Sequence, residues 1–265
     1  MPEGHTIHRL ARDHARLFRG RRVRASSPQG RFEAGAALLD GRALERLDPW
    51  GKHLLYGFEA DLWLHVHLGL YGKWSSGPLP APPPKGALRL RLEGGVAYAD
   101  LRGPTACEIV TPPQVEALFA RLGLDPLRRD ADPEQAWARI SRSRTGVGVL
   151  LMDQSVVAGV GNVYRAEALY RAGLSPYRPG REVGRATWDA LWLDLVTLLR
   201  AGVRAGRIVT TRPEHRSRRS GRPTREDSHY VYRRAGLPCR VCGTPVQTAV
   251  MVARNLFWCP HCQPA

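Results

Sequence analysis

The stretches Cys239-Arg240-Val241-Cys242 and Cys259-Pro260-His261-Cys262, separated by sixteen residues, decide the fold of the C-terminal segment. Two C-x2-C pairs at this spacing are typical of a zinc ribbon, in which four thiolates hold one Zn²⁺ tetrahedrally. Such a site is closed, so its zinc is structural and stabilises a β-hairpin too small to fold alone. His261 lies between two cysteines but is the weaker candidate ligand, because four thiolates already complete the shell.

The segment between the two cysteine pairs has the pattern of a β-hairpin. Strand-like residues 250–252 and 256–258 flank Arg254 and Asn255, so we predict that these two residues form the hairpin tip. An arginine at a hairpin tip of a basic protein is well placed to hold phosphates by bidentate contacts. The alternative is an ordinary solvent-exposed turn arginine.

The composition predicts a polyanionic partner. The 265 residues leave room for two modest domains or one large one, and 40 basic against 24 acidic residues give a net charge of +16. Such a balance most often indicates nucleic-acid binding, although charge alone does not exclude a ribosome-type or merely basic protein. Only Lys52, Lys73 and Lys85 are lysines. Arginine can serve wherever positive charge alone is needed. A retained lysine therefore indicates a position that needs a compact ammonium group or a titratable amine.

The sequence favours a soluble, cytosolic protein. The polar N-terminus is followed by no apolar region typical of a signal peptide, and no apolar run approaches the roughly 20 residues of a membrane helix. Thiols stay reduced in the cytosol, so the five cysteines are not expected to form disulfides. Cys107 lies far from the two cysteine pairs, and we expect it to act as a small buried hydrophobic residue.

The first half of the chain reads as a β-rich domain, a sandwich or flattened barrel, that follows a helix at about 5–18. Strand-like segments at 62–68, 88–92 and 96–99 are broken by glycine and proline, and the proline cluster at 78–84 predicts a surface loop.

From about residue 113 the apolar period becomes helical, so we place the boundary between the halves near 112–130. Helices are predicted at 115–122, 133–140 and 187–201, the last ended by Gly202 or Gly206. Residues 207–228 are rich in arginine and lack an apolar period. This composition favours a mobile loop that orders on DNA, with a merely solvated loop as the alternative.

A glycine-rich turn precedes another predicted helix. Gly159-Val160-Gly161-Asn162 leads into a helix that runs from about Asn162 to Gly173. Backbone amides at a helix N-terminus bind phosphate, and the Asn162 side chain can add a hydrogen bond. Taken alone the motif is weak, since glycines here also suit close helix packing.

The N-terminus reads Met1-Pro2-Glu3-Gly4, and methionine is normally trimmed before a residue as small as proline. Pro2 would then carry a free secondary amine, partly neutral near pH 7, which attacks aldehydes and stays a cationic iminium that withdraws electrons. The adjacent Glu3 can supply or accept protons. The alternative is a frayed terminus without a role.

The N-terminal Pro2-Glu3-Gly4, the segment 159–164 and the four-cysteine finger with Arg254 occur here in a specific order. In that order they resemble the formamidopyrimidine-DNA glycosylase/endonuclease VIII family, from residue 2 to Gln263. The resemblance implies an α+β fold in three parts. These are an N-terminal β-sandwich catalytic domain at 1–117, a helix–two-turns–helix DNA-binding domain at 118–229 and a zinc finger at 230–265.

The resemblance also implies roles for individual residues. Pro2 corresponds to the nucleophile that attacks C1′ of the damaged nucleotide, and Glu3 to the proton donor and acceptor. Lys52 matches the lysine that contacts the phosphate beside the lesion. Asn162 matches a phosphate-binding asparagine, and Arg254 the finger arginine that grips phosphates around the extruded nucleotide.

The resemblance favours the endonuclease VIII branch, which excises oxidised pyrimidines. Leu70 and Tyr71 are similar to that branch's wedge, which fills the gap left by a flipped nucleotide; ordinary hairpin packing is the alternative. Residues 100–105 lack the Arg-x-Phe wedge of the purine-specific branch. The start Gly4-His5-Thr6 lacks the Pro-Glu that commonly follows in the family, which removes a second carboxylate.

The leading hypothesis is therefore a bifunctional glycosylase and AP lyase of base excision repair, acting as a monomer on damaged duplex DNA or on single strands. The alternatives are an 8-oxoguanine/formamidopyrimidine glycosylase and a noncatalytic zinc-ribbon DNA-binding protein. We do not expect His65 and His67 to bind metal, because they alternate with apolar residues and have no third ligand nearby in sequence.

Overall fold

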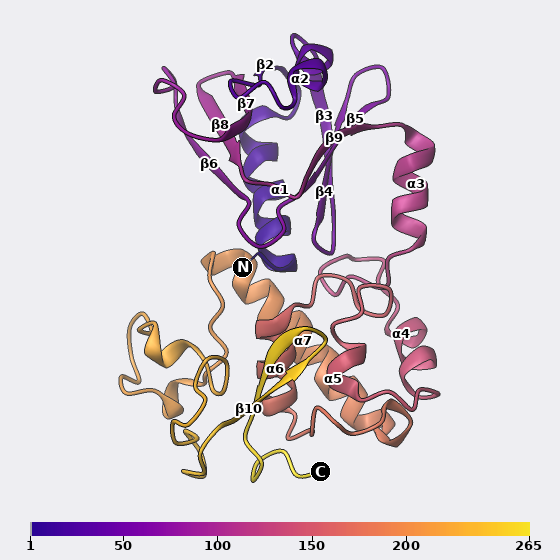
Figure 1. Cartoon of the computed structure of the whole chain (residues 1–265), viewed down its shortest axis with the longest axis vertical. Coiled ribbons are helices and arrows are strands. Elements are labelled where there is room, and N and C mark those ends of the chain that lie inside the picture. The colour runs from indigo at the N-terminus through magenta and orange to yellow at the C-terminus, as the bar shows by residue number, and fades with distance from the viewer. Residues whose placement is uncertain (1) are drawn as a thin grey trace. The chain divides into compact units, whose positions relative to one another are not determined.

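The computed structural model describes residues 2–265 and divides at residues 121 and 122 into two compact units (Figure 1). Met1, on whose removal the argument for Pro2 depends, lies outside the described residues. Among residues 2–265, no helix is both long and apolar enough to cross a membrane.

The first unit is a sandwich of two antiparallel sheets with helix α1 (Gly4–Phe18) packed against it. One sheet has the strand order β1-β3-β4-β5-β9, and the other has the order β2-β7-β8-β6. The strands are β1 (Arg21–Arg22), β2 (Arg24–Ser26), β3 (Ala43–Trp50), β4 (His53–Phe58), β5 (Leu62–His67), β6 (Lys73–Pro78), β7 (Leu88–Gly94), β8 (Ala97–Arg102) and β9 (Ala106–Val110). Helices α2 (Glu33–Leu39) and α3 (Pro112–Ala120) complete the unit.

Helix α1 forms where the sequence predicted a helix. Ile7, Ala11, His14 and Phe18 recur every three or four residues, and all four are buried on one face. This face joins residues of both sheets in a single core. The β-sandwich expected from the sequence is confirmed.

The second unit is helical and ends in a two-stranded hairpin. Its elements are α4 (Pro133–Ile140), α5 (Val147–Leu150), α6 (Asn162–Arg171), α7 (Arg185–Ala205), β10 (Gln247–Met251) and β11 (Arg254–Trp258), with one-turn 3-10 segments η1 (Gly180–Glu182), η2 (Pro213–His215) and η3 (Glu226–Ser228). Its main core is formed largely by α4–α7 and includes the fully buried Tyr164, Trp188 and Leu195. A second cluster joins α6 to the finger.

Of the two predicted stops for α7, Gly202 and Gly206, the structure selects the second, and both bounds of α3 differ from the prediction. Helix α7 runs through the buried Gly202 and stops at Gly206, whose φ of 69° suits a glycine C-cap. Helix α3 begins at Pro112, earlier than predicted, because Thr111 and Gln114 form a capping box. It ends at Ala120 instead of residue 122.

The basic segment 207–228 is attached to the second unit at both ends. Thr210 donates from its backbone N–H to the Ser228 carbonyl at 2.9 Å, and the Thr211 hydroxyl donates to the Asp227 carbonyl at 2.6 Å. The buried Asp227 carboxylate accepts hydrogen bonds from Ser217. Between these anchors the side chains of Arg218, Arg219 and Arg222 are exposed.

Candidate functional site

The N-terminal pair lies at the start of α1. Glu3 is the N-cap residue, its backbone is extended at φ −128°, and its carbonyl accepts a hydrogen bond from the Thr6 N–H at 2.9 Å. The Glu3 side chain is buried and Pro2 is half-buried. A carboxylate at a helix N-terminus interacts favourably with the helix dipole. The start of α1 therefore holds a buried carboxyl group directly beside the proline.

Lys52 lies in the turn between β3 and β4, between Gly51 and His53. Trp50 pairs with His53 across the hairpin, so Gly51 and Lys52 are the two turn residues. Gly51 has a φ of 59°, which a two-residue hairpin turn demands and glycine adopts without strain. Lys52 therefore lies in the hairpin turn between the two strands and not within a strand.

Leu70 and Tyr71 project from a tight turn after β5. Their side chains are 40% and 87% exposed, and the turn is closed by a hydrogen bond from the Gly72 N–H to the Leu68 carbonyl at 2.9 Å. Gly69 has a φ of 64°, and a Cβ there would lie 1.9 Å from Thr105 Oγ1. Thr105 therefore packs closely against Gly69 of this turn, whereas the side chains of Leu70 and Tyr71 are exposed to solvent.

His65 belongs to a cluster of hydrogen-bonded side chains that the sequence did not predict. His53 Nδ1 lies 2.9 Å from His65 Nε2, and His65 Nδ1 lies 2.8 Å from Glu108 Oε1. His67 lies against His53 with ring centroids 4.8 Å apart. Sequence reasoning missed this cluster because strand register brings together β4, β5 and β9 from distant parts of the chain.

The four finger cysteines meet the geometric demands of zinc. Their Sγ atoms all lie within 4.8 Å of one another, with Cys239 and Cys262 3.8 Å apart and Cys242 and Cys259 3.5 Å apart. A tetrahedron with Zn–S distances of roughly 2.3 Å has edges of about 3.8 Å. Within residues 2–265 this is the one group of side chains arranged to hold a metal ion. The zinc is structural, as the sequence predicted.

Asn162 and the finger hairpin are brought together in the second unit. The Asn162 side-chain amide donates to the Asn255 carbonyl at 2.9 Å, and its oxygen accepts a hydrogen bond from Arg165. Asn162 is buried and begins α6, while Arg254, next to Asn255, is exposed. The two residues expected to bind phosphate thus lie on neighbouring elements.

The predicted hairpin tip was wrong by two residues. The turn consists of Val252 and Ala253, with φ values of 54° and 51°, and Arg254 is the first residue of β11, opposite Met251. Positive φ at both turn positions matches the twist of a two-residue hairpin, a geometry that usually selects Asn-Gly. Because valine and alanine carry no such signal, the sequence pattern misplaced the turn.

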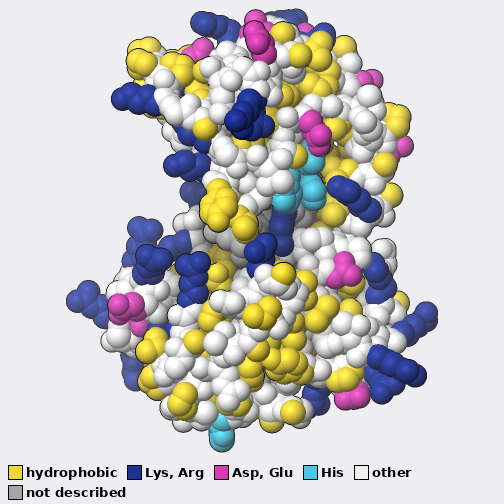
Figure 2. Space-filling model, viewed as in Figure 1, with side chains coloured by type: hydrophobic (Ala, Val, Ile, Leu, Met, Phe, Trp, Pro, Cys, Tyr) yellow, Lys and Arg dark blue, Asp and Glu magenta, His cyan; other side chains and the backbone are white. Residues whose placement is uncertain are grey.

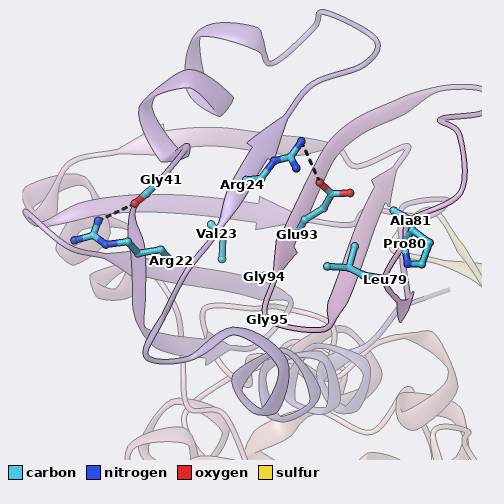
Figure 3. Close-up of a pocket in the computed structure, with 10 residues that line it drawn as sticks. All are labelled: Arg22, Val23, Arg24, Gly41, Leu79, Pro80, Ala81, Glu93, Gly94 and Gly95. Carbon is cyan, nitrogen blue, oxygen red and sulfur yellow. Dashed lines mark hydrogen bonds and ion pairs between the residues drawn. The ribbon is translucent and has the colours of Figure 1, made fainter.

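A separate cavity of about 720 Å³ in the first unit lies between β1, β2, the β7–β8 turn and residues 79–81 (Figure 3). The two arginines that line it, Arg22 and Arg24, interact with other residues of the same unit. Arg22 donates to the Gly41 carbonyl at 2.7 Å, and Arg24 forms an ion pair with Glu93 at 3.7 Å. Neither Pro2 nor Glu3 lines this cavity, so it is distinct from the predicted catalytic pair.

Three family models match consecutive parts of the chain. Residues 1–107 match the formamidopyrimidine-DNA glycosylase N-terminal domain, residues 122–213 its H2TH domain, and residues 236–265 a zinc finger found in FPG and IleRS.

Full-length relatives agree with these matches. Endonuclease 8 1 of Mycobacterium tuberculosis is 52% identical over 268 residues, covering 99% of this chain and 100% of the relative. The formamidopyrimidine-DNA glycosylase of Methylococcus capsulatus is 33% identical, covering 99% of this chain and 98% of the relative.

Solved structures support the same fold. A complex of Lactococcus lactis Fpg with DNA that contains N7-benzyl-Fapy-dG matches with a TM-score of 0.83 at 22% identity, over 100% of both chains. A complex of that protein with abasic-site DNA matches with a TM-score of 0.82. Sandwich, helical domain and zinc finger together show that the chain belongs to the formamidopyrimidine-DNA glycosylase/endonuclease VIII family, as an endonuclease VIII-type bifunctional DNA glycosylase and AP lyase of base excision repair.

Proposed function

We propose that this enzyme removes oxidised pyrimidines from DNA through the secondary amine of Pro2 and then cuts the strand on both sides of the lesion. The observation that carries the proposal is the placement of Pro2 beside the buried Glu3 at the start of α1. The higher identity to Endonuclease 8 1 than to the formamidopyrimidine-DNA glycosylases supports the pyrimidine preference.

The chemistry begins with attack of the Pro2 nitrogen on C1′ of the flipped nucleotide. The base leaves with a proton, and the sugar ring opens to an iminium in which Pro2 nitrogen and C1′ share a double bond. The iminium withdraws electrons, so loss of a C2′ proton expels the 3′ phosphate, and a second elimination expels the 5′ phosphate. Hydrolysis then releases the sugar fragment and restores the Pro2 amine. Glu3 donates and accepts protons in these steps.

The remaining site residues position the DNA. Lys52 would contact the phosphate beside the lesion, and Asn162 and Arg254 the phosphates around the extruded nucleotide. Leu70 and Tyr71 would fill the vacated space in the stack, which suits an exposed apolar and an exposed aromatic side chain.

These roles assign catalysis to residues 1–117, helical DNA binding to 118–229 and phosphate gripping to the finger at 230–265. The enzyme would act as a cytoplasmic, nucleoid-associated monomer on damaged duplex DNA. With a net charge of +16, its DNA affinity should fall as salt rises.

Borohydride trapping tests the covalent step. Sodium borohydride should link the wild-type protein to DNA that contains thymine glycol or 5-hydroxycytosine, whereas Pro2→Gly and a form that retains Met1 should give no adduct. A wild-type protein that binds lesion DNA and never traps would overturn the proposal in favour of a noncatalytic binding protein. Preferential trapping on 8-oxoguanine would overturn the pyrimidine preference alone.

A further inference from the structure

A chain of hydrogen bonds crosses the sheet next to Lys52. It runs from Glu108 on β9 through His65 on β5 to His53 on β4, with distances of 2.8 Å and 2.9 Å. His65 is buried, whereas Glu108 is 57% exposed at one end of the chain. His53 directly follows Lys52 and is half-buried at the other end. Histidine side chains gather on the face of this unit that Figure 2 shows.

The carboxylate determines where the hydrogens lie. An ionised Glu108 only accepts, so His65 Nδ1 carries a hydrogen. In neutral His65 the Nε2 atom is then bare and accepts from His53 Nδ1–H. Neutral His53 consequently carries its hydrogen on Nδ1 and presents a bare Nε2 lone pair.

Adding one proton to this chain of hydrogen bonds changes the hydrogen-bonding role of His53 Nε2. If the proton resides on His65, both of its ring nitrogens donate, so His53 accepts at Nδ1 and carries its hydrogen on Nε2. If the proton resides on His53 itself, both of its nitrogens carry hydrogens. In either case His53 Nε2 changes from an acceptor to a donor.

Burial and nearby positive groups disfavour the charged forms of His53 and His67. Burial, with contributions from His67, His65, Arg121 and Lys52, lowers the pKa of His53 to about 3. Burial likewise lowers the pKa of His67, again with neighbouring positive groups contributing. Glu108 and Arg121 also line a cavity of about 300 Å³ beside His65. A nearby negative charge would favour the protonated state.

We propose that His53 is a second phosphate-contacting residue beside Lys52 and that the Glu108–His65–His53 chain takes up a proton when a DNA phosphate binds there. A phosphodiester oxygen only accepts hydrogen bonds, so it opposes a bare Nε2 and stabilises Nε2–H. Binding and protonation are therefore thermodynamically linked, and each strengthens the other. The inference rests on the proposed phosphate contact of Lys52.

Binding measurements on DNA that contains a tetrahydrofuran abasic analogue test the linkage without catalysis. At constant salt, the wild-type Kd should fall about fivefold or more between pH 8 and pH 6, because one linked proton changes Kd by up to tenfold per pH unit. Calorimetry in buffers of different ionisation enthalpy should show proton uptake. Nitrogen-15 spectra of the free protein should show His53 as the Nδ1–H tautomer.

Two variants separate this role from a merely structural one. His53→Gln places a permanent amide donor near the Nε2 position, so it should bind DNA at pH 8 at least as well as wild type, with no proton uptake. Glu108→Gln can donate to His65 Nδ1 and so reverse the chain without a proton; it should tighten binding at pH 8 and flatten the pH dependence. Glu116→Gln, an exposed charge change on α3, should leave the linkage intact.

Proton uptake that persists in His53→Gln, or a wild-type Kd independent of pH, would overturn the inference. A wild-type protein that traps with borohydride but lacks proton uptake would leave the covalent mechanism standing and remove this proposal alone. Proton uptake without trapping would support this proposal and remove the covalent mechanism alone.

Discussion

The side-chain amide of Asn162, the first residue of α6, donates a hydrogen bond to the backbone carbonyl of Asn255 in the finger hairpin at 2.9 Å. Ninety-three residues of sequence separate the two. The bond ties the helix end expected to bind phosphate to the strand that carries Arg254. The zinc finger is thus held against the helical domain by a polar contact as well as by the apolar cluster around Tyr170.

Glu3→Gln separates base removal from strand cleavage. The amide keeps the volume of the side chain but cannot transfer a proton, so release of an intact damaged base should slow by about 100-fold or more. Cleavage at a preformed abasic site should slow less, because no base has to leave. Single-turnover rates on matched substrates measure both steps. Equal losses on the two substrates would contradict the role given to Glu3.

The wedge can be tested without disturbing the fold. Leu70→Ala and Tyr71→Ala should each lower kcat/KM on duplex lesions by about tenfold, because each stacking or wedge contact is worth on the order of 1–3 kcal/mol. Melting temperatures should hardly change, since both side chains are exposed. Val96→Ala, a 75% exposed apolar residue of the same domain, is the control and should be fully active. Undiminished rates in both wedge variants would favour plain turn packing.

Glu167 is a buried anchor of the segment that leads to the finger. Its carboxylate accepts hydrogen bonds from the N–H groups of Tyr230, Val231 and Tyr232 and from the Thr210 hydroxyl. Glu167→Ala leaves these donors buried and unpaired, so the free energy of unfolding should fall by about 3 kcal/mol or more.

Urea denaturation measures this loss, with the exposed Glu182→Ala as control. Protease digestion of the variant should also begin between residues 207 and 228, where the ends of the segment lose their attachment. A stability change as small as that of the control would show that water replaces these hydrogen bonds.

Zinc removal should affect one part of the enzyme selectively. Cys242→Ser should lower the zinc content and weaken DNA binding by about tenfold or more, because the hairpin that carries Arg254 depends on the metal for its fold. Cys107→Ala removes a thiol in the first domain, where burial raises the pKa of the thiol to about 12, and should keep one zinc per chain. Metal analysis and DNA titration check both outcomes.

His14 should make the first domain sensitive to acid. It is buried, its Nδ1 lies 2.8 Å from the Tyr56 hydroxyl, and burial lowers its pKa from 6.5 to about 4. The unfolded chain therefore binds more protons between these values, so stability is fully present above pH 6.5 and declines as pH falls toward 4. The shift corresponds to a loss on the order of 3 kcal/mol.

Denaturant titrations from pH 4 to pH 8 measure this decline. His14→Gln should reduce the acid dependence, whereas His8→Gln on the same helix serves as the matched substitution at a less buried position. The same acid slope in wild type and His14→Gln would assign the effect to other groups.

The sequence by itself determined the features that depend on neighbouring residues. Cysteine spacing predicted the zinc site, apolar periodicity predicted α1 and α4, and the Pro2-Glu3 pair predicted the candidate nucleophile and proton-transfer group. Each of these signals lies within a few residues or in one repeated motif. Local propensity and ligand chemistry were therefore sufficient to find them.

Only the tertiary structure decided how distant segments meet. It moved the hairpin tip to Val252 and Ala253, joined Asn162 to the finger and assembled His53, His65 and Glu108 from three strands. Strand register and helix docking follow from packing over the whole core, where a shift of one residue turns every side chain to the opposite face. No local sequence pattern specifies the strand register or the docking of the helices.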